Sequence, residues 1–309
     1  MNNDSVKVCI ERDMPIINRF VHCGKQGCAH VLHKNSDIYF WNREEYNIVV
    51  KCVPLTKTAS LPHNFMRVST LSRFDAEPFM EIKMLTELEK MKKVCPHYIC
   101  IYHWTVYDGH IYRNSHIDCR QFSTTSVVLY LEKMDMDCYE WSKKFVPDTM
   151  ACKIMMFQIL FALCCMHKHI GFVHGDAHVG NVLIKRHRTD KLQKIQYSVY
   201  NSIFDIPNDG SQWCLSDFGR SRCIDQNSTN NDHTWADTPR LEFINFVHSV
   251  HTHVAKTTML KNELSLVMHF LNSTTDVDPR ALFLVLFDEF IATGDSKQDS
   301  KHRHYYTLS

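Results

Sequence analysis

The sequence predicts an α+β fold in which strands fill the first part of the chain and helices most of the second. Residues 46–53 are a β-branched run typical of a strand. Residues 149–170 carry the strongest helical pattern, with little polar surface, and two further helical patterns follow residue 255. A chain of 309 residues that is 44% hydrophobic can bury the core of one large domain or of two lobes.

Composition argues against several classes of protein. The formal net charge is +1, so neither a nucleic-acid footprint nor a polybasic membrane surface is expected. No apolar run follows Met1, which argues against a signal peptide. The longest clean apolar run, 281–287, is too short to span a bilayer. We expect no nucleic-acid partner and no membrane span, and we expect a monomer.

Cysteine and histidine are abundant, with 13 and 20 residues. An odd number of cysteines without a C-x-x-C pair argues against a disulfide framework and against a zinc ribbon. The pairs Cys23/Cys28 and Cys95/Cys100 are loosely spaced and have no matching second half, so we expect no zinc site there. The pattern favours reduced, mostly buried thiols in an intracellular protein.

The first strands follow a polar lead at 1–19. A glycine-containing turn, Gly24–Val31, precedes the strand at 46–53. A lysine inside such a β-branched strand is unusual unless its ammonium has a partner, and Lys51 is in that position. An edge-strand lysine that faces solvent is the alternative.

A helix is predicted next, starting at the candidate N-cap Asp75 and continuing to Leu88. Its apolar face holds Ile82, Leu85 and Leu88. Residues 52–74 before it are expected to form an inserted loop. Two aromatic or β-branched segments then predict the antiparallel end of a sheet, and they are His97–Trp104 and Ser126–Leu131. The helix at 149–170 follows, with Gly171 as its natural C-cap.

The chain is organised around the stretch Val173–Ile184. This stretch begins and ends as buried strands would, and between them Asp176 is followed five positions later by Asn181. A second acid, Asp217, lies in the turn Leu-Ser-Asp-Phe-Gly at 215–219. An acid on a tight loop, an amide five residues later and an acid on another turn are the groups used in phosphoryl transfer. The first acid orients and deprotonates a hydroxyl, and the other two groups hold Mg²⁺ on nucleotide phosphates.

These motifs, in this order, resemble the protein-kinase family, in a divergent form similar to the serine/threonine kinases encoded by large DNA viruses. The resemblance covers about residues 20–255. It implies a two-lobed protein-kinase-like fold, with a β-rich N-lobe at 20–132, a helical, shortened C-lobe at 133–292, the nucleotide between them, and a polar tail at 293–309. It also implies ATP and Mg²⁺ as cofactors, a protein substrate, and a location in the host cytoplasm or the virion.

The resemblance assigns roles to individual residues. Asp176 would orient the acceptor hydroxyl and take its proton, while Asn181 and Asp217 would hold Mg²⁺. Lys51 would contact the α/β-phosphates and pair with Glu81, because Glu81 begins the Glu-Ile-x-x-Leu pattern of the corresponding kinase helix. The competing glutamates are Glu77 and Glu87. The further nucleotide contacts implied are Gly24, Gly27 and Val31 of a degraded glycine-rich loop, Glu132 and Met134 at the adenine, and Asp137 at the ribose. An acidic linker is the alternative for the last three.

Several positions depart from the kinase pattern. Gly175 replaces an arginine that normally contacts a phosphorylated activation loop, so we infer that activity does not need that phosphorylation. His178 replaces a lysine, and it would contact the γ-phosphate when protonated or position the hydroxyl when neutral. Residues 185–212 contain a polar insertion that we expect to be an exposed hairpin extension, and no Ala-Pro-Glu motif closes residues 220–237. Glu242 falls where kinases place an aspartate that braces the catalytic-loop backbone.

The chain is expected to end with two helices and a frayed tail. The first helix carries Leu260, Leu264, Val267 and Leu271. The second spans 278–291, and the polar tail begins at Thr293.

Two other functions remain open. The order His-Gly-Asp-x-His-x-Gly-Asn also occurs in small-molecule phosphotransferases such as the aminoglycoside and choline kinases, although the glycine at 219 and the Glu-Ile-x-x-Leu helix favour a protein kinase. The degraded glycine-rich loop and the missing Ala-Pro-Glu motif leave room for a catalytically weak pseudokinase that acts as a binding module. The function that the sequence favours is a serine/threonine protein kinase.

Overall fold

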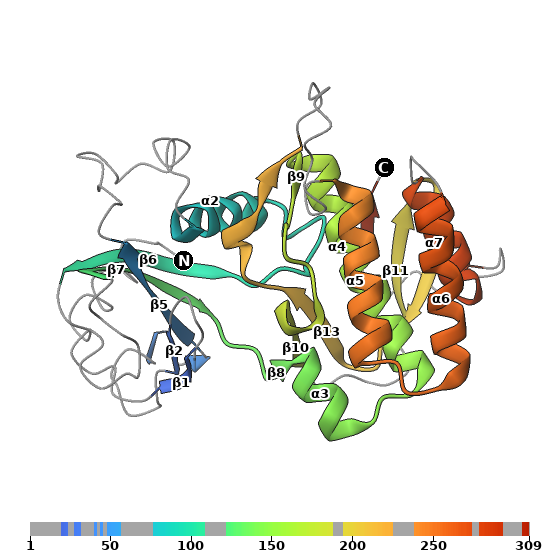
Figure 1. Ribbon diagram of the computed structural model, residues 1–309, viewed down its shortest axis with the longest axis horizontal. Helices are drawn as coiled ribbons and strands as arrows, with labels where there is room; N and C mark the ends of the chain where they lie inside the picture. The colour runs from blue at the N-terminus through green and yellow to red at the C-terminus, as the bar shows by residue number, and fades with distance from the viewer. Residues whose placement is uncertain are drawn as a thin grey trace. The chain divides into compact units, whose positions relative to one another are not determined.

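In the computed structural model the strands of the larger sheet lie early in the chain and three helices lie between residues 239 and 286, as the sequence predicts (Figure 1). Short strands also occupy much of 172–223 and end at 308. The structure describes residues 20–23, 28–31, 40–41, 44–45, 48–56, 77–108, 122–187, 194–224, 238–273, 278–292 and 305–308. The α+β fold class is confirmed, and its content is compatible with a two-lobed kinase-like fold. The chain divides into two compact units: the first holds residues up to 89 together with 99–133, and the second holds 90–98 and the residues from 134 on.

The first unit is built on a five-stranded sheet with the spatial order β1-β2-β5-β7-β6. Its strands are β1 (Phe20–Cys23), β2 (Cys28–Val31), β5 (Ile48–Thr56), β7 (Phe122–Glu132) and β6 (Ile101–Asp108). All neighbouring strands pair antiparallel. A separate ribbon pairs β3 (Phe40–Trp41) with β4 (Glu44–Glu45). Lys51 therefore lies in the central strand β5, which excludes the edge-strand alternative for this lysine.

The helix predicted after the inserted loop is α2 (Glu77–Lys90). Its predicted apolar face is buried, as the exposure of Ile82, Leu85 and Leu88 is 1% or less. The candidate N-cap Asp75 lies outside the described residues. Of the two strands predicted after this helix, the second is confirmed within β7. The first was placed too early, because β6 begins at Ile101 and the preceding residues 97–98 instead bond to a strand of the second unit.

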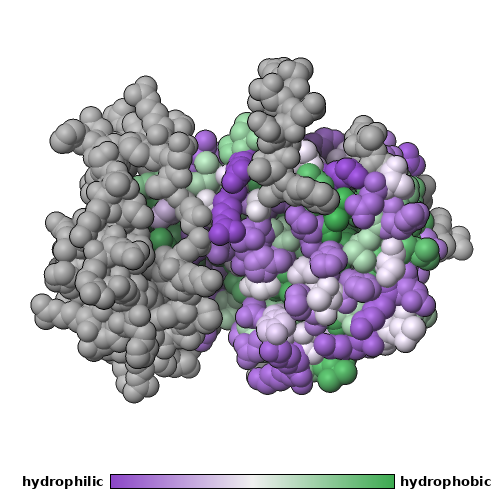
Figure 2. Space-filling view, viewed as in Figure 1, coloured by the Kyte–Doolittle hydropathy of each residue, from purple (hydrophilic) through white to green (hydrophobic). Residues whose placement is uncertain are grey.

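The second unit is organised around α4 (Thr149–His169), which ends one residue before the predicted limit. Every residue from Ile154 to Met166 is buried. Gly171 follows the helix with φ +72° and donates its N–H to the Met166 carbonyl at 3.1 Å, which confirms the expected glycine cap. Among the described helices, α4 is long and apolar enough to cross a membrane by length and composition alone, but 78% of that window is buried inside the protein. Where Figure 2 colours the surface, hydrophilic residues are mixed with small apolar groups.

The other helices described in this unit are α3 (Cys138–Phe145), α5 (Pro239–His253), α6 (Thr258–Ser273) and α7 (Pro279–Leu286). Helices α5, α6 and α7 lie side by side (Figure 1). The apolar residues predicted for α6 are confirmed as its buried face. The last predicted helix was too long, because the backbone leaves the helical conformation at Phe287 (φ −135°) and only a 3-10 turn, Asp288–Phe290, follows.

Three small sheets complete the description of this unit. The first contains β8 (Met136–Asp137), β10 (Val182–Arg186) and β13 (Ser211–Leu215). The second pairs β9 (Phe172–Val173) with β14 (Arg222–Cys223). The third contains β11 (Lys194–Val199), β12 (Ser202–Pro207) and β15 (Tyr305–Leu308).

The insertion at 185–212 is a hairpin, as predicted, but it is not an exposed extension. Strands β11 and β12 pair antiparallel, and one face of the pair is completely buried. The residues on that face are Tyr197, Val199, Phe204 and Ile206. Phe157 of α4 contacts the rings of both Tyr197 and Phe204 at 5.0 and 5.4 Å. The apolar residues alternate with polar ones inside the hairpin, and the charged residues on either side of it concealed this pattern.

The tail is not frayed where the structure describes it. Strand β15 pairs parallel with β11, and Leu308 is completely buried. The ring of Tyr306 lies 5.3 Å from that of Tyr197. The expectation failed because four residues in a polar tail are too few to reveal a strand by periodicity when the partner strand is distant in the sequence.

A buried histidine joins the insertion hairpin to the segment before β6. His97 donates from Nδ1 to the Trp213 carbonyl at 2.9 Å, and its Nε2 accepts from the Tyr197 hydroxyl at 2.8 Å. Burial lowers the pKa of His97 to about 3, so the ring stays neutral at physiological pH. The carbonyl of His97 also accepts from the Leu215 N–H at 2.9 Å, so this residue holds β13 at two points.

The hairpin's place in the core can be tested with two adjacent residues of β12. Phe204→Ala should lower the free energy of unfolding by about 3–5 kcal/mol, because it removes a fully buried ring. Ile203→Ala lies on the opposite face, where the side chain is 45% exposed, and should change it by less than about 1 kcal/mol. Urea unfolding followed by tryptophan fluorescence measures both. Equally small changes would show that the hairpin does not belong to the core.

Neutral burial of His97 predicts a pH dependence of stability. A histidine whose folded pKa lies below 6.5 takes up its proton only on unfolding, so stability falls as the pH drops below 6.5 and continues to fall towards pH 3. One such group contributes up to about 1.4 kcal/mol per pH unit. Between pH 6.5 and 5, the unfolding free energy should therefore fall more steeply in the wild type than in His97→Gln. Identical slopes in urea titrations would contradict this assignment.

Candidate active site

The hairpin of β10 and β13 brings the two polar motifs to one place. Val182 pairs with Leu215, so Asn181 and Ser216 lie next to each other at the end of the two strands. The Ser216 N–H and hydroxyl both donate to the Asn181 carbonyl, at 2.9 and 3.0 Å. Asp217 follows at once, in a left-handed conformation with φ +64°. The insertion hairpin accounts for the long sequence interval between the motifs without separating them in space.

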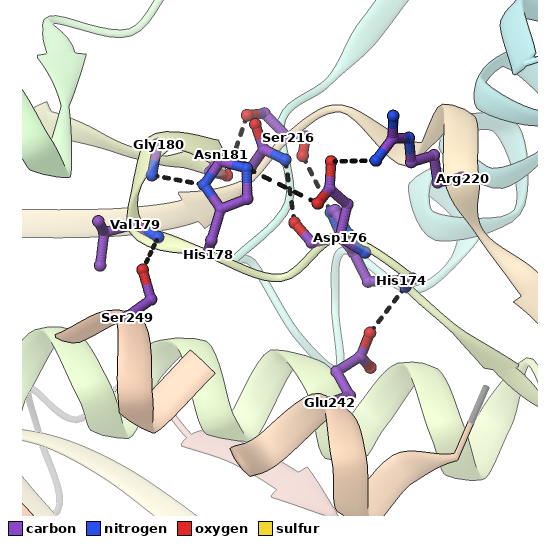
Figure 3. A network of polar contacts seen from close by, with 11 residues as sticks. His174, Asp176, His178, Val179, Gly180, Asn181, Ser216, Arg220, Glu242 and Ser249 are labelled. Atoms are coloured by element: carbon purple, nitrogen blue, oxygen red, sulfur yellow. Dashed lines mark hydrogen bonds and ion pairs between the residues drawn. The ribbon is translucent and has the colours of Figure 1, made fainter. Parts of the chain in front are cut away.

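Asp176 is held on its loop by Asn181. The Asn181 side-chain amide donates from Nδ2 to the Asp176 carbonyl at 3.0 Å. The Asp176 carboxylate is 32% exposed and has two basic neighbours, with Nη1 of Arg220 at 3.6 Å and Nε2 of His178 at 3.8 Å (Figure 3). Both distances exceed those of hydrogen bonds, so the carboxylate stays accessible to another hydrogen-bond donor such as a hydroxyl.

His178 is positioned by its own loop. Its Nδ1 accepts the Gly180 N–H at 3.0 Å, which caps the 3-10 turn Val179–Asn181 and leaves Nε2 on the side of Asp176. The ring is exposed, as 46% of the side chain is accessible. Contact of His178 with a hydroxyl or with a phosphate stays a prediction.

His174 fixes the backbone on the other side of Asp176. Its completely buried ring donates from Nε2 to the Ser216 carbonyl at 2.9 Å and accepts the Asp176 N–H on Nδ1 at 3.3 Å. Burial lowers the pKa of His174, although Glu242 and the Ser216 carbonyl oppose the shift. The centroid of the His174 ring also lies 4.9 Å from that of Phe218, which follows Asp217 directly. This contact packs the segment before Asp176 against the segment after Asp217.

Gly175 has a backbone that excludes a side chain. Its φ is +78°, and a Cβ at this position would lie 2.2 Å from the Arg220 carbonyl oxygen. The arginine of the usual kinase pattern therefore has no place here, because the turn after Asp217 approaches the loop too closely. The glycine that replaces this arginine therefore has a geometric explanation.

Helix α5 braces the loop at two points (Figure 3). Glu242 is 2% exposed and accepts the Gly175 N–H on Oε1 at 2.9 Å, so the predicted brace is confirmed. Ser249, two turns later on the same helix, accepts the Val179 N–H at 3.2 Å. The two contacts hold the backbone on both sides of Asp176.

The first unit holds the predicted lysine–glutamate pair. The Nζ of Lys51 lies 3.0 and 2.8 Å from the two carboxylate oxygens of Glu81. Glu81 is 2% exposed and Lys51 is 23% exposed, so the pair is mostly desolvated and its geometry is well defined. Of the three glutamates considered on α2, the structure pairs Glu81 with Lys51. Contact of this lysine with a phosphate stays a prediction.

Two of the three residues predicted to contact adenine or ribose make hydrogen bonds within the protein. Glu132 ends β7 and exchanges hydrogen bonds with Cys100, donating its N–H at 2.9 Å and accepting on its carboxylate at 3.3 Å. Met134 is 8% exposed. Asp137 caps α3 by accepting the Glu140 N–H at 2.6 Å. Capping is thus a structural role for Asp137 that the sequence analysis did not assign.

Two of the three positions predicted for the glycine-rich loop, Gly24 and Gly27, lie outside the described residues. The third, Val31, is the last residue of β2. The segment in which an Ala-Pro-Glu motif was sought, after Ile224, also lies outside the described residues until Thr238.

Sequence reasoning missed three polar residues that hold the loop. Ser216 and Ser249 act on backbone groups, and serine is too common for either position to stand out. A seven-residue spacing from Glu242 is the one signal that could have suggested Ser249. The third residue is His167, which lies in the last turn of α4 and contacts Glu242.

Comparison with known proteins gives limited support for the resemblance to kinases. No family model matches the sequence. A probable serine/threonine-protein kinase 380R of Invertebrate iridescent virus 6 is 34% identical over 98 residues, which cover 32% of this chain and 18% of that protein. The chain thus matches less than a fifth of the relative's length. The similarity supports a kinase-like protein and nothing finer.

The two positive-φ glycines on either side of β9 form a matched pair for testing the loop. Gly175→Ala should lower the unfolding free energy by more than about 2 kcal/mol, because strain at φ +78° adds to the clash with Arg220. Gly171→Ala, with φ +72° and open space around the new Cβ, should cost only about 1 kcal/mol. Thermal unfolding and urea titration measure the difference. Equal costs would show that the loop does not approach Arg220 this closely.

Proposed function

We propose that the protein transfers the γ-phosphoryl group of ATP to serine or threonine hydroxyls of a protein substrate. The observation that carries the proposal is the placement of Asp176, Asn181 and Asp217 by one hairpin end and one braced loop. An accessible carboxylate beside an amide and a second carboxylate is the arrangement that phosphoryl transfer requires.

The choice of asparagine at 181 supports this role. Its Nδ2 donates to the Asp176 carbonyl, a bond that an aspartate could not donate. Its Oδ1 is an oxygen ligand of the kind that Mg²⁺ prefers, as is the Asp217 carboxylate. One residue could therefore shape the loop of the base and hold the metal.

The residues of the chain fit Mg-ATP. Asn181 and Asp217 supply hard oxygen ligands, and Mg²⁺ would take its remaining ligands from phosphate oxygens and water. When bound, Mg-ATP supplies the phosphoryl group and neutralises part of its charge. Lys51, fixed by its two bonds to Glu81, would hold the α- and β-phosphates.

Asp176 would orient the acceptor hydroxyl and take its proton. Its partly exposed carboxylate can accept a hydrogen bond, and its backbone is fixed from both sides. Arg220 places positive charge next to it, where negative charge is transferred, and the ring of His178 lies near the other carboxylate oxygen. A protein substrate is favoured over a small molecule by the partial similarity to a viral protein named as a probable serine/threonine kinase.

The test is transfer of labelled γ-phosphate from Mg-ATP to casein and to histone. Asp176→Asn should reduce the rate at least about 100-fold, because it removes the proton acceptor. The fold should survive, since the carboxylate is partly exposed and the loop is held through backbone groups. Asp209→Asn makes the same chemical change at an exposed loop position and should leave the rate unchanged.

Other outcomes would point to the rival functions. Transfer to an aminoglycoside or to choline, with none to either protein, would identify a small-molecule phosphotransferase. ATP binding detected by thermal shift, without transfer to any acceptor, would identify a pseudokinase. Equal rates for the wild type and Asp176→Asn would remove Asp176 from the reaction.

A further inference from the structure

One buried carboxylate connects three parts of the second unit. Glu242 of α5 accepts the Gly175 N–H on Oε1 at 2.9 Å, and its Oε2 lies 2.5 Å from Nε2 of His167. His167 belongs to the last turn of α4. The carboxylate therefore joins α4, α5 and the loop that carries Asp176.

Both members of the pair are shielded from water. The side chain of Glu242 is 1% exposed and that of His167 is 9% exposed. A buried carboxylate must have its oxygens hydrogen-bonded, and an unpaired oxygen would favour rotation or hydration of the group. The Gly175 N–H satisfies only one of the two oxygens. His167 is the side chain bonded to the other.

The length of the glutamate side chain makes the second contact necessary. Glutamate has one more rotatable bond than the aspartate expected at this position, so a single hydrogen bond leaves the orientation of its carboxylate less restricted. His167 is itself held in place, since its ring packs 5.3 Å from the ring of Phe243. The histidine thus fixes the rotation of the carboxylate group, so that one of its oxygens stays directed at the Gly175 N–H.

We propose that His167 is a positioning residue for the phosphoryl-transfer reaction. It holds Glu242, which fixes the Gly175 N–H, and this fixes the backbone that leads directly to Asp176. His167 touches neither substrate nor cofactor in this proposal. The inference rests on the proposed function for its kinetic part, whereas its structural part concerns the Gly175 N–H and is measurable without turnover.

A purely stabilising pair makes different predictions. If His167 only stabilised the fold, its loss would lower the melting temperature and speed amide exchange throughout the unit. If it positions the loop, its loss should act at Gly175 first. The chain contains nine glycines, so selective ¹⁵N-glycine labelling gives a simple spectrum in which Gly171 and Gly210 serve as internal references.

His167→Leu removes the N–H that bonds to Glu242 and puts an apolar side chain of similar bulk in its place. Exchange of the Gly175 N–H should become about tenfold faster relative to Gly171 and Gly210. The kcat for protein phosphorylation should fall about 10- to 100-fold with the KM for ATP nearly unchanged, because the base is misplaced while nucleotide contacts remain. His169→Leu, at an exposed position of the same helix end, should change neither quantity.

A second pair of variants covers the case in which His167→Leu does not fold. His167→Gln places its amide nitrogen near the position of Nε2 and should retain most of the wild-type exchange rate and kcat. His167→Asn is too short to reach Glu242 and should behave like the donor-free variant. Equal behaviour of the Gln and Asn variants would overturn the proposal.

The measurements separate this proposal from the proposed function. Unchanged Gly175 exchange in His167→Leu, or equal acceleration at all three glycines, would overturn the positioning role whether or not the protein transfers phosphate. Selective acceleration at Gly175 in a protein without any phosphotransfer would retain the hydrogen-bonded chain from His167 to the loop and refute the proposed function instead.

Discussion

Burial of α4 on all its sides is the constraint on which the second unit depends. A helix that is apolar around its whole circumference must be surrounded, and here each side is covered by a different part of the chain. Phe157 contacts the ring of Tyr197 in the insertion hairpin and the ring of Phe283 in α7. The buried Gln158 accepts the Trp213 N–H at 2.8 Å and donates to the Ser211 carbonyl at 3.3 Å, so it bonds to β13 as a neighbouring strand would. The strand that leads to Asp217 is thereby fixed to the core helix.

The candidate site depends on this core through backbone contacts. The loop around Asp176 is bonded to α5 by Glu242 and Ser249, and Glu242 in turn contacts α4. Asn181 connects the loop to the turn before Asp217, because its amide donates to one and its carbonyl accepts from the other. Few of these bonds involve the carboxylates proposed to do chemistry. The loop that carries Asp176 is therefore positioned by groups other than its carboxylate, which remains partly exposed.

The sequence predicted those parts of the fold whose signal is local. Periodicity located α2, α4 and α6, and motif spacing located Asp176, Asn181, Asp217 and the pair Lys51–Glu81. It failed where the partner is distant in the chain. The buried face of β11 and the strand β15 are recognisable only once the two strands are known to pair, and alternation over four to six residues is too short a signal. The bond from His167 to Glu242 spans 75 residues and has no local pattern at all.

Gly175 shows how a departure from a family pattern can follow from packing. The positive φ and the nearby Arg220 carbonyl leave no room for a side chain, so an arginine that binds a phosphorylated segment is excluded by the backbone itself. A loop without that arginine needs another source of order. The structure supplies one in the hydrogen bond from the Gly175 N–H to Glu242, which exists without any modification of the chain. The backbone that leads to Asp176 is therefore held by a buried contact that needs no modification of the chain, and this argues that the proposed activity is not switched on by phosphorylation of the segment after Asp217.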